Sequence, residues 1–198
     1  FYSPSRFSDV VFVVEGMKLY ASKQILAHTS SFFEKMFFDD FEKSQEREII
    51  MDDVSSEEFR ITLDMIYDNR RKFDDDNVEF LLKMADKYEI TGFLERAEKF
   101  LLRAVTPGDP MNTKQPEYTE LPMHTKLRLA DQYKLDVLKD HILGDIDKFE
   151  EIEELNNSDS YKHYSREIVD FLMKKMVKFC KKMKNESESD SDDSEDSN

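Results

Sequence analysis

The stretch "SDVVFVVEGMKLYASKQILAHTSSFFEKMFFDDFEKSQEREIIMDDVSSEEFRITLDMIY", from Ser8 to Tyr67, decides the fold. It opens with a β-branched run, Val10 to Val14, which predicts a first strand. Gly16 supplies a turn, and Lys18 to Tyr20 continues as a second strand. After a helical stretch, Arg47 to Met51 predicts a third strand. The order strand, turn, strand, helices, strand, helix therefore predicts a mixed α+β unit.

Between the second and third strands, and again after the third, the apolar spacing changes to that of helices. The apolar residues with this spacing are Ile25, Leu26, Phe32, Phe33, Met36 and Phe37, and later Phe59, Leu63 and Ile66. Ser31 followed by Glu34, and Ser55 followed by Glu58, have the spacing of capping boxes. Two helix starts are therefore predicted, one at each serine.

Several segments of this stretch occur in the order found in one family. "SDV", "KQILAHTSSFFEKMF", "IIMDDVSSEEF" and "MIY", together with "NVEFLLKMADKYEITGFLERAEKFLL" from Asn77 to Leu102, resemble a BTB/POZ domain. The chain is similar to the BTB part of adaptors that join MATH and BTB domains. The resemblance implies an α+β fold, a small mixed β-sheet flanked by helical hairpins. It also implies a protein-interaction module, frequently an adaptor that brings a target to a cullin-RING ubiquitin ligase.

Composition divides the chain into four parts. Residues 1–104 form the BTB-like domain, and residues 105–122 a linker whose prolines prevent a regular helix. Residues 123–184 form an all-helical extension that resembles a BACK region, with a polar joint at 150–160 and a long amphipathic helix from about Ser165 to Lys184. Residues 185–198 form an acidic Ser/Asp/Glu tail that we expect to be disordered. Two segments have similar sequences, "LLKMADKYEI" (81–90) and "KLRLADQYKL" (126–135). The similarity predicts the same local structure in both, a helix followed by a turn into the next helix.

The charge and cysteine content exclude several classes of function. The 198 residues carry a formal net charge of −15, which argues against a nucleic-acid partner because phosphate binding needs clustered Lys and Arg. No apolar run reaches the length of a membrane span. A single cysteine, Cys180, fits a reducing compartment, so we expect a cytoplasmic or nuclear protein. Because the chain begins at Phe1 without a methionine, we also expect a further upstream segment.

Residue constellations for catalysis, metals or cofactors are not found in the sequence. The four histidines lie in four different segments without companions at metal-ligand spacing, which favours surface or packing roles. The glycines are isolated and form no phosphate-binding loop. Cys180 lies on the apolar side of the last helix, where a packing role is favoured. We therefore expect a protein that is not an enzyme and has no metal or cofactor; only measured turnover would support an enzyme.

The family resemblance places a cullin contact after the "FEKMF" helix, at a hydrophobic residue, any residue and a glutamate. The matching positions here are Phe41, Glu42 and Lys43, so the hydrophobic anchor is present and the acid is replaced by a lysine. We expect this reversal to weaken a charge-assisted contact by about 1–3 kcal/mol. The predicted cullin-binding residues are Phe37, Phe41, Glu42 and Tyr88, and the recruited protein is unknown.

Self-association without cullin binding is the alternative function. In the family, the familiar dimeric BTB domains exchange a helix between the two subunits, and this helix precedes the first strand. In this sequence the segment ahead of the first strand is "FYSPSRF", residues 1–7. This stretch is too short for that helix and contains Pro4. A homodimer therefore stays open as a prediction.

The end of the chain combines a basic segment with an acidic one. The lysines of the last helix are Lys174, Lys175, Lys178, Lys181, Lys182 and Lys184. The favoured interpretation is a solvated helix face with a solubilising tail; a calmodulin-target helix and a nuclear-import signal are the alternatives. Ser187 and Ser189 each have an acidic residue three positions later and are candidate phosphorylation sites.

Overall fold

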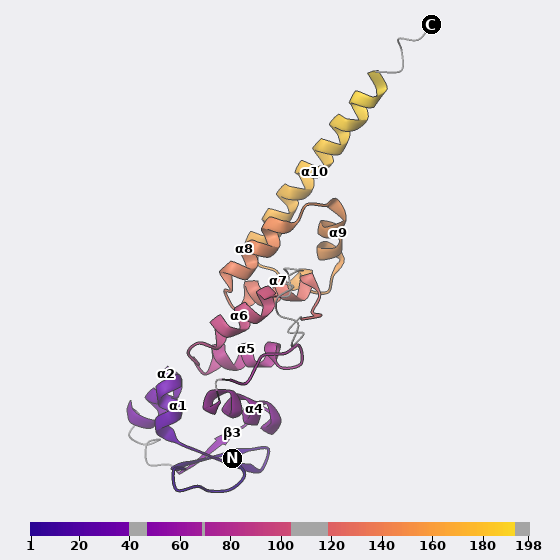
Figure 1. The fold of residues 1–198 in the computed structure, drawn as a ribbon. Coiled ribbons are helices and arrows are strands. Elements are labelled where there is room, and N and C mark those ends of the chain that lie inside the picture. Colours follow the sequence, from indigo (N-terminus) through magenta and orange to yellow (C-terminus); the bar gives the residue numbers. More distant parts are fainter. Residues whose placement is uncertain (40–46, 69, 104–118, 193–198) are drawn as a thin grey trace. The chain divides into compact units, whose positions relative to one another are not determined.

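The computed structural model describes residues 1–39, 47–68, 70–103 and 119–192, with side chains as far as residue 185 and excepting that of residue 103. The chain divides into two compact units, Phe1–Thr119 and Glu120–Asn198, which are considered separately (Figure 1). The predicted linker at 105–122 falls mostly on residues 104–118, outside the described residues.

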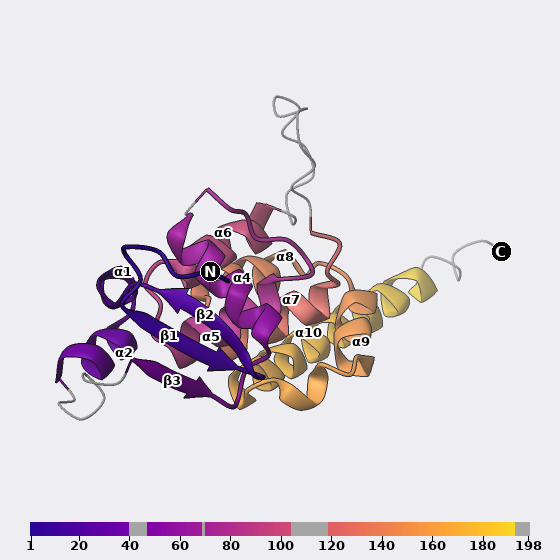
Figure 2. The same ribbon diagram turned by 90° about the horizontal axis from the view of Figure 1, so that it is seen from below.

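The first unit contains a three-stranded mixed sheet in the order β2-β1-β3 (Figure 2). Strand β1 (Val10–Val14) pairs antiparallel with β2 (Met17–Ala21) and parallel with β3 (Glu48–Met51). The turn between β1 and β2 has positive φ at Glu15 and Gly16, 48° and 77°. Positive φ at both central residues matches the twist of a two-residue hairpin, which confirms the predicted turn.

Helices follow the strands in the predicted order. In the first unit they are α1 (Lys23–Thr29), α2 (Ser31–Glu34), the π-helical turn η1 (Lys35–Asp39), α4 (Ser56–Tyr67), α5 (Val78–Lys87) and α6 (Phe93–Arg103). The capping box at the start of α4 is confirmed, because Ser55 Oγ accepts from Glu58 N at 3.2 Å and Ser55 N donates to Glu58 Oε2 at 3.4 Å.

The predicted capping box at Ser31 is wrong. The cap of α2 is Ser30, whose Oγ accepts from Phe33 N at 3.1 Å, because the extended backbone of Ser30 points its side chain at the free amides.

The core of the first unit is an aromatic cluster. Phe12 of β1 has its ring centroid 4.9 Å from that of Phe59, 5.7 Å from that of Phe33 and 6.5 Å from that of Phe37. The Tyr88 ring stacks on Phe33 at 5.4 Å. All five side chains are buried. The cluster joins the sheet to α2, η1, α4 and the end of α5, so it determines where these elements lie relative to one another.

The two segments of similar sequence end their helices in the same way. After α5, Glu89 has φ 47° and Ile90 N donates to Ala85 O at 3.0 Å. After α7 (Met123–Gln132), Lys134 has φ 57° and Leu135 N donates to Ala130 O at 2.9 Å. A left-handed residue followed by this backward hydrogen bond is the Schellman ending of a helix. The predicted repeat of a local device is therefore confirmed.

The second unit is helical, as expected. After α7 its helices are α8 (Asp136–Asp145), α9 (Phe149–Asn157), the 3-10 turn η2 (Tyr161–His163) and α10 (Arg166–Asp192). The predicted polar joint at 150–160 is wrong, since α9 covers most of it. Ile152 and Leu155 of α9 are fully buried, and Glu151 caps its start by accepting from Lys148 N at 3.1 Å. Ile152 and Leu155 are three residues apart, so both side chains lie on one face of the helix. Their burial stabilises the helix although acidic residues surround them in sequence.

The last helix is longer and less buried than predicted. Its backbone remains helical to Asp192, past the expected end at Lys184, and residues 193–198 of the predicted tail lie outside the described residues. No proline or glycine follows Lys184 to stop a helix. Ile168 and Leu172 are buried, whereas Cys180 is exposed, so the predicted packing role of the cysteine is wrong.

Candidate protein-interaction surface

A groove of about 640 Å³ follows strand β3. It is lined by Phe32, Met36, Glu48, Ile49, Ile50, Met51, Asp52, Asp53, Lys87 and Tyr88. These residues come from α2, η1, β3 with the turn after it, and the end of α5. On the outer edge of β3, no strand among the described residues pairs with it (Figure 2). The groove is therefore a site where an edge strand and apolar side chains can both meet a partner.

The alternation of β3 decides which side chains reach the groove and which enter the core. Ile49 and Met51 are buried, with register partners Phe12 and Val14 in β1. Ile50, between them, has 70% of its side chain exposed. Successive side chains of a strand point to opposite faces, so the same run supplies two core residues and one exposed apolar contact.

Ser30 connects the groove-lining helix to the end of α5. Its Oγ donates to Tyr88 O at 2.5 Å while accepting from Phe33 N, and its backbone pairs with Ile90 in an antiparallel bridge. Thr91 N donates to Thr29 O at 2.8 Å in the same place. Because Ser30 is buried, these bonds are shielded from water. They hold α2 against the turn that carries Tyr88.

Acidic groups dominate the charge of the groove. Glu48, Asp52 and Asp53 line it together with a single basic residue, Lys87. The Lys87 ammonium donates to the Asp53 carboxylate, and this bond lowers the pKa of Asp53. A partner with a basic side chain beside an apolar one would fit this charge and surface.

The Tyr88 hydroxyl lies beneath this ion pair. Burial raises the pKa of Tyr88, and the neighbouring charges of Lys87 and Asp53 act on it in opposite directions. Although it is close enough to feel both charges, the buried hydroxyl oxygen has no partner at hydrogen-bonding geometry among the described residues. Tyr88 therefore contributes its ring to the core.

Of the predicted cullin-binding residues, the structure describes Phe37 and Tyr88. Phe37 and Tyr88 are only 2% and 1% exposed, so their side chains belong to the core and cannot meet a partner directly in this conformation. Phe38, beside Phe37, is 62% exposed. Phe41 and Glu42 lie outside the described residues, as does Lys43, and their contact role stays a prediction.

Sequence reasoning missed Ile50, Phe32 and Met36 as groove residues. For Ile50 the signal was available, because an apolar residue between two core positions of an edge strand faces solvent. Phe32 and Met36 could not be assigned, since their spacing is also that of core residues. The candidate phosphorylation sites Ser187 and Ser189 lie on the helical backbone of α10, and their side chains are outside the described set.

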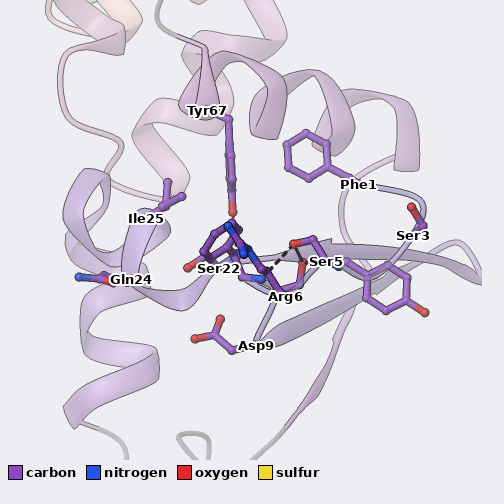
Figure 3. Close-up of a pocket in the computed structure, with 12 residues that line it drawn as sticks. Phe1, Ser3, Ser5, Arg6, Asp9, Ser22, Gln24, Ile25 and Tyr67 are labelled. Carbon is purple, nitrogen blue, oxygen red and sulfur yellow. Dashed lines mark hydrogen bonds between the residues drawn. The ribbon is translucent and has the colours of Figure 1, made fainter.

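A second hollow, of about 710 Å³, lies between the amino-terminal segment and the helices α1 and α4 (Figure 3). Tyr20 N donates to Phe1 O at 2.8 Å, and the Phe1 ring meets the Tyr67 ring edge-on at 4.9 Å. The Tyr67 hydroxyl accepts from Ser22 N at 2.6 Å. Apolar side chains exposed at this hollow are Phe7, Ile25 and Tyr67. The hollow is therefore a second surface suited to protein contact.

Within the described ranges, no three His, Cys, Asp or Glu residues lie where they could hold a metal ion. His124 Nδ1 instead lies 3.0 Å from Ser160 Oγ, and His141 Nε2 lies 3.6 Å from Asp145 Oδ2. Among the helices that the structure describes, none combines the length and the apolarity needed to cross a bilayer.

The sequence of this chain is similar to those of known proteins that contain BTB domains. BTB and MATH domain-containing protein 36 of Caenorhabditis elegans is 32% identical over 170 residues, covering 86% of this chain and 49% of that protein. Kelch repeat and BTB domain-containing protein 4 of Mus musculus is 31% identical over 103 residues, covering 52% of this chain and 19% of that protein. The chain thus spans half or less of the length of these relatives.

Solved structures include the BTB domain of human gigaxonin, with 23% identity and a TM-score of 0.42 over 48% of this chain and 79% of that one. The family profile described as the BTB/POZ domain matches residues 1–104, which is more than half of the chain. The match covers the sheet, the aromatic cluster and the helices α1 to α6. This protein therefore belongs to the BTB/POZ domain family.

Proposed function

We propose that this protein is a non-enzymatic adaptor that works by protein–protein contact, as a substrate-recruiting or scaffold component of a cullin-RING ubiquitin ligase. Membership of the BTB/POZ family and relatives named for MATH or Kelch parts support the adaptor role. The cullin role is supported by one observation, the groove along β3. In sequence, the Phe41–Lys43 segment that resembles the family's cullin contact lies between the groove residues Met36 and Glu48.

The chemistry of the groove suggests how a cullin would be held. Exposed Ile50 and half-buried Phe32 and Met36 offer apolar contact area. Asp52 offers an acceptor for a basic partner group, whereas the Glu48 carboxylate already accepts from the Lys18 ammonium. In this proposal Asp52 takes over part of the pairing that Lys43 cannot provide.

Titration calorimetry with a cullin amino-terminal domain tests the proposal. Ile50→Asp should weaken binding by about tenfold or more, because it puts a charge where an apolar contact is buried. Lys43→Glu should strengthen binding about tenfold by restoring an acceptor. Ile25→Asp, an equivalent change at the second hollow, is the matched control and should leave cullin affinity unchanged.

The result that would reject the ligase role is equally definite. If the chain shows no binding at about 50 μM and Lys43→Glu creates none, cullin recruitment is excluded at any useful affinity. If Ile25→Asp weakens binding as much as Ile50→Asp, the contact does not use the β3 groove.

Self-association is the second candidate function, and the exposed Phe7, Ile25 and Tyr67 around the second hollow favour it. Light scattering over a concentration series should then show a defined oligomer that Ile25→Asp abolishes and Ile50→Asp preserves. A strictly monomeric species would count against self-association and leave the cullin proposal standing.

A further inference from the structure

The middle part of α10, Met173–Lys184, has an unusual composition and is called the lysine–methionine helix below. Its twelve residues are six lysines and six apolar residues, with no acid. The apolar residues are Met173, Met176, Val177, Phe179, Cys180 and Met183. A segment with a charge of +6 within a chain of net charge −15 is a local reversal of sign.

The two kinds of side chain lie on opposite sides of the helix. At about 100° per residue, the six apolar positions fall within an arc of about 160°. The lysines fall in the remaining arc, except Lys184, which lies among the apolar positions. The lysine–methionine helix therefore has a continuous apolar face bordered by positive charge.

Much of the apolar face is exposed. Met173, Val177 and Met183 are 49–58% exposed and Cys180 is exposed, while Met176 and Phe179 are half-buried. Ile168 and Leu172, which precede this segment in α10, are fully buried. In both views of the ribbon this part of α10 runs beyond α8 and α9 of its own unit (Figures 1 and 2).

The start of α10 is anchored to other elements of the second unit. The lysine–methionine helix is therefore presented as a formed helix. Ser165 N donates to the buried Asp131 carboxylate at 2.6 Å. Lys175 Nζ donates to Leu143 O at 2.9 Å, and its ammonium lies 5.5 Å from the centre of the Phe171 ring. A helix that is already formed loses less conformational entropy when a partner binds it.

We propose that the lysine–methionine helix docks into an acidic, methionine-lined groove of the kind that calcium-loaded EF-hand pairs expose. Charge complementarity carries the assignment, since the helix offers only positive charge around its apolar face. Twelve helical residues span about 18 Å, which suits a groove that encloses a few turns. Methionine side chains are unbranched and flexible, so those of the helix and those of the groove can pack against each other in more than one arrangement.

A second copy of the chain and a membrane fit the helix less well. Two copies aligned along their apolar faces would bring lysines against lysines. The acidic tail has no apolar residue with which to cover the face. On an anionic membrane a helix lying flat would carry the acids of residues 186–192 onto the surface, whereas a groove that ends near Lys184 leaves them outside.

The probe is calcium-loaded calmodulin, titrated into the 198-residue chain by calorimetry with and without a calcium chelator. We expect a calcium-dependent complex in the micromolar range that weakens as salt is added. Cys180 is the only cysteine and lies on the apolar face, so its alkylation, followed by peptide mass spectrometry, should slow in the complex. This second readout locates the contact.

Matched charge variants separate docking from nonspecific attraction. The triple change Lys174→Glu, Lys178→Glu and Lys181→Glu should weaken binding about a hundredfold. The control Lys83→Glu, Lys134→Glu and Lys162→Glu alters net charge equally at exposed lysines elsewhere and should change affinity less than about threefold. Met173→Ser with Val177→Ser should weaken binding at least about tenfold without unfolding the chain, because both side chains are exposed.

Three results would overturn the proposal. One is the absence of a calcium-dependent complex at about 100 μM chain. Another is an equal loss of affinity in both triple-lysine variants. The third is binding to mixed phosphatidylcholine–phosphatidylserine vesicles, or lysine-dependent self-association, in place of calmodulin binding. Ile50→Asp should not affect docking, so this proposal and the cullin proposal fail independently.

Discussion

The aromatic cluster of the first unit and the lysine–methionine helix use apolar side chains in opposite ways. Phe12, Phe33 and Phe59 are at most 1% exposed, and each lies against other rings of the cluster. Met173 and Val177 also belong to a regularly spaced apolar face, that of helix α10, but they remain about half exposed. The difference is in the surroundings: the cluster has a sheet on one side and helices on the other, whereas the lysine–methionine helix runs beyond α8 and α9 of its own unit (Figures 1 and 2). Amphipathic spacing predicts that a face exists, and only neighbouring elements decide whether it is covered.

The strongest test of this contrast is Phe12→Ala. Its ring contacts three others, so its removal should leave a cavity and lower the free energy of unfolding by about 3–5 kcal/mol. Urea unfolding followed by circular dichroism measures the loss, and hydrogen exchange of the β1 amides assigns it to the first unit. Phe38→Ala, at an exposed ring, is the control and should stay within about 0.5 kcal/mol.

The pH dependence of stability extends the comparison to Tyr164, a buried residue of the second unit. The Tyr164 hydroxyl donates to His124 O at 3.2 Å, and burial raises the pKa of Tyr164 to about 12. The unfolded chain loses this proton near pH 10 while the folded chain keeps it, so stability is full below pH 10 and falls as pH rises toward 12. The loss is of the order of 2 kcal/mol.

Tyr164→Phe is the matched variant for this measurement. It should be slightly less stable than the unaltered protein at pH 8 and should lack this part of the alkaline decline. Urea midpoints between pH 8 and pH 11 would reveal it. Parallel curves for the two proteins would show that Tyr164 ionises equally well in the folded state.

A smaller effect is expected at the margin of the aromatic core, where helices begin. Ser55→Ala removes the confirmed cap of α4 and should lower the free energy of unfolding by about 1 kcal/mol. Ser31→Ala should change it by less than about 0.5 kcal/mol, because Ser30 caps α2 instead. Thermal melts of the two variants rank them, and the reverse order would restore the capping box predicted at Ser31.

The smallest effect is expected on the lysine–methionine helix itself. Val177→Ser should leave the free energy of unfolding unchanged within about 0.5 kcal/mol, because Val177 is already half exposed to water and the two residues have similar helix propensity. Circular dichroism would verify that helicity is kept. A loss above about 1 kcal/mol would mean that this face is covered in the free protein after all, and it would remove the basis for docking.

Much of the first unit could be predicted from local signals. Val10–Val14, Gly16 and the Ser55–Glu58 spacing are short-range patterns whose meaning does not depend on distant residues, and all three are confirmed. The choice between Ser30 and Ser31 as a cap could not be made this way. It depends on the extended backbone at Ser30, which the bridge to Ile90 holds in place from another part of the chain.

The groove was predictable only in part. The family resemblance directed attention to Phe41–Lys43, beside the region where the groove lies, but it also selected Phe37 and Tyr88. Both are buried because the rings of β1, α2 and α4 surround them. Whether an aromatic residue faces a partner or a core depends on contacts far apart in sequence, and periodicity is the same in both cases.

By itself the sequence determined the order of strands and helices, the family, and the reversal of charge near the end of the chain, because these follow from neighbouring residues and their spacing. The tertiary structure alone decided that Ile50 is exposed beside a groove, that Phe37 and Tyr88 are buried, and that Met173, Val177 and Met183 are exposed. Exposure is a property of what surrounds a side chain, and those surroundings are assembled from segments that are distant in sequence.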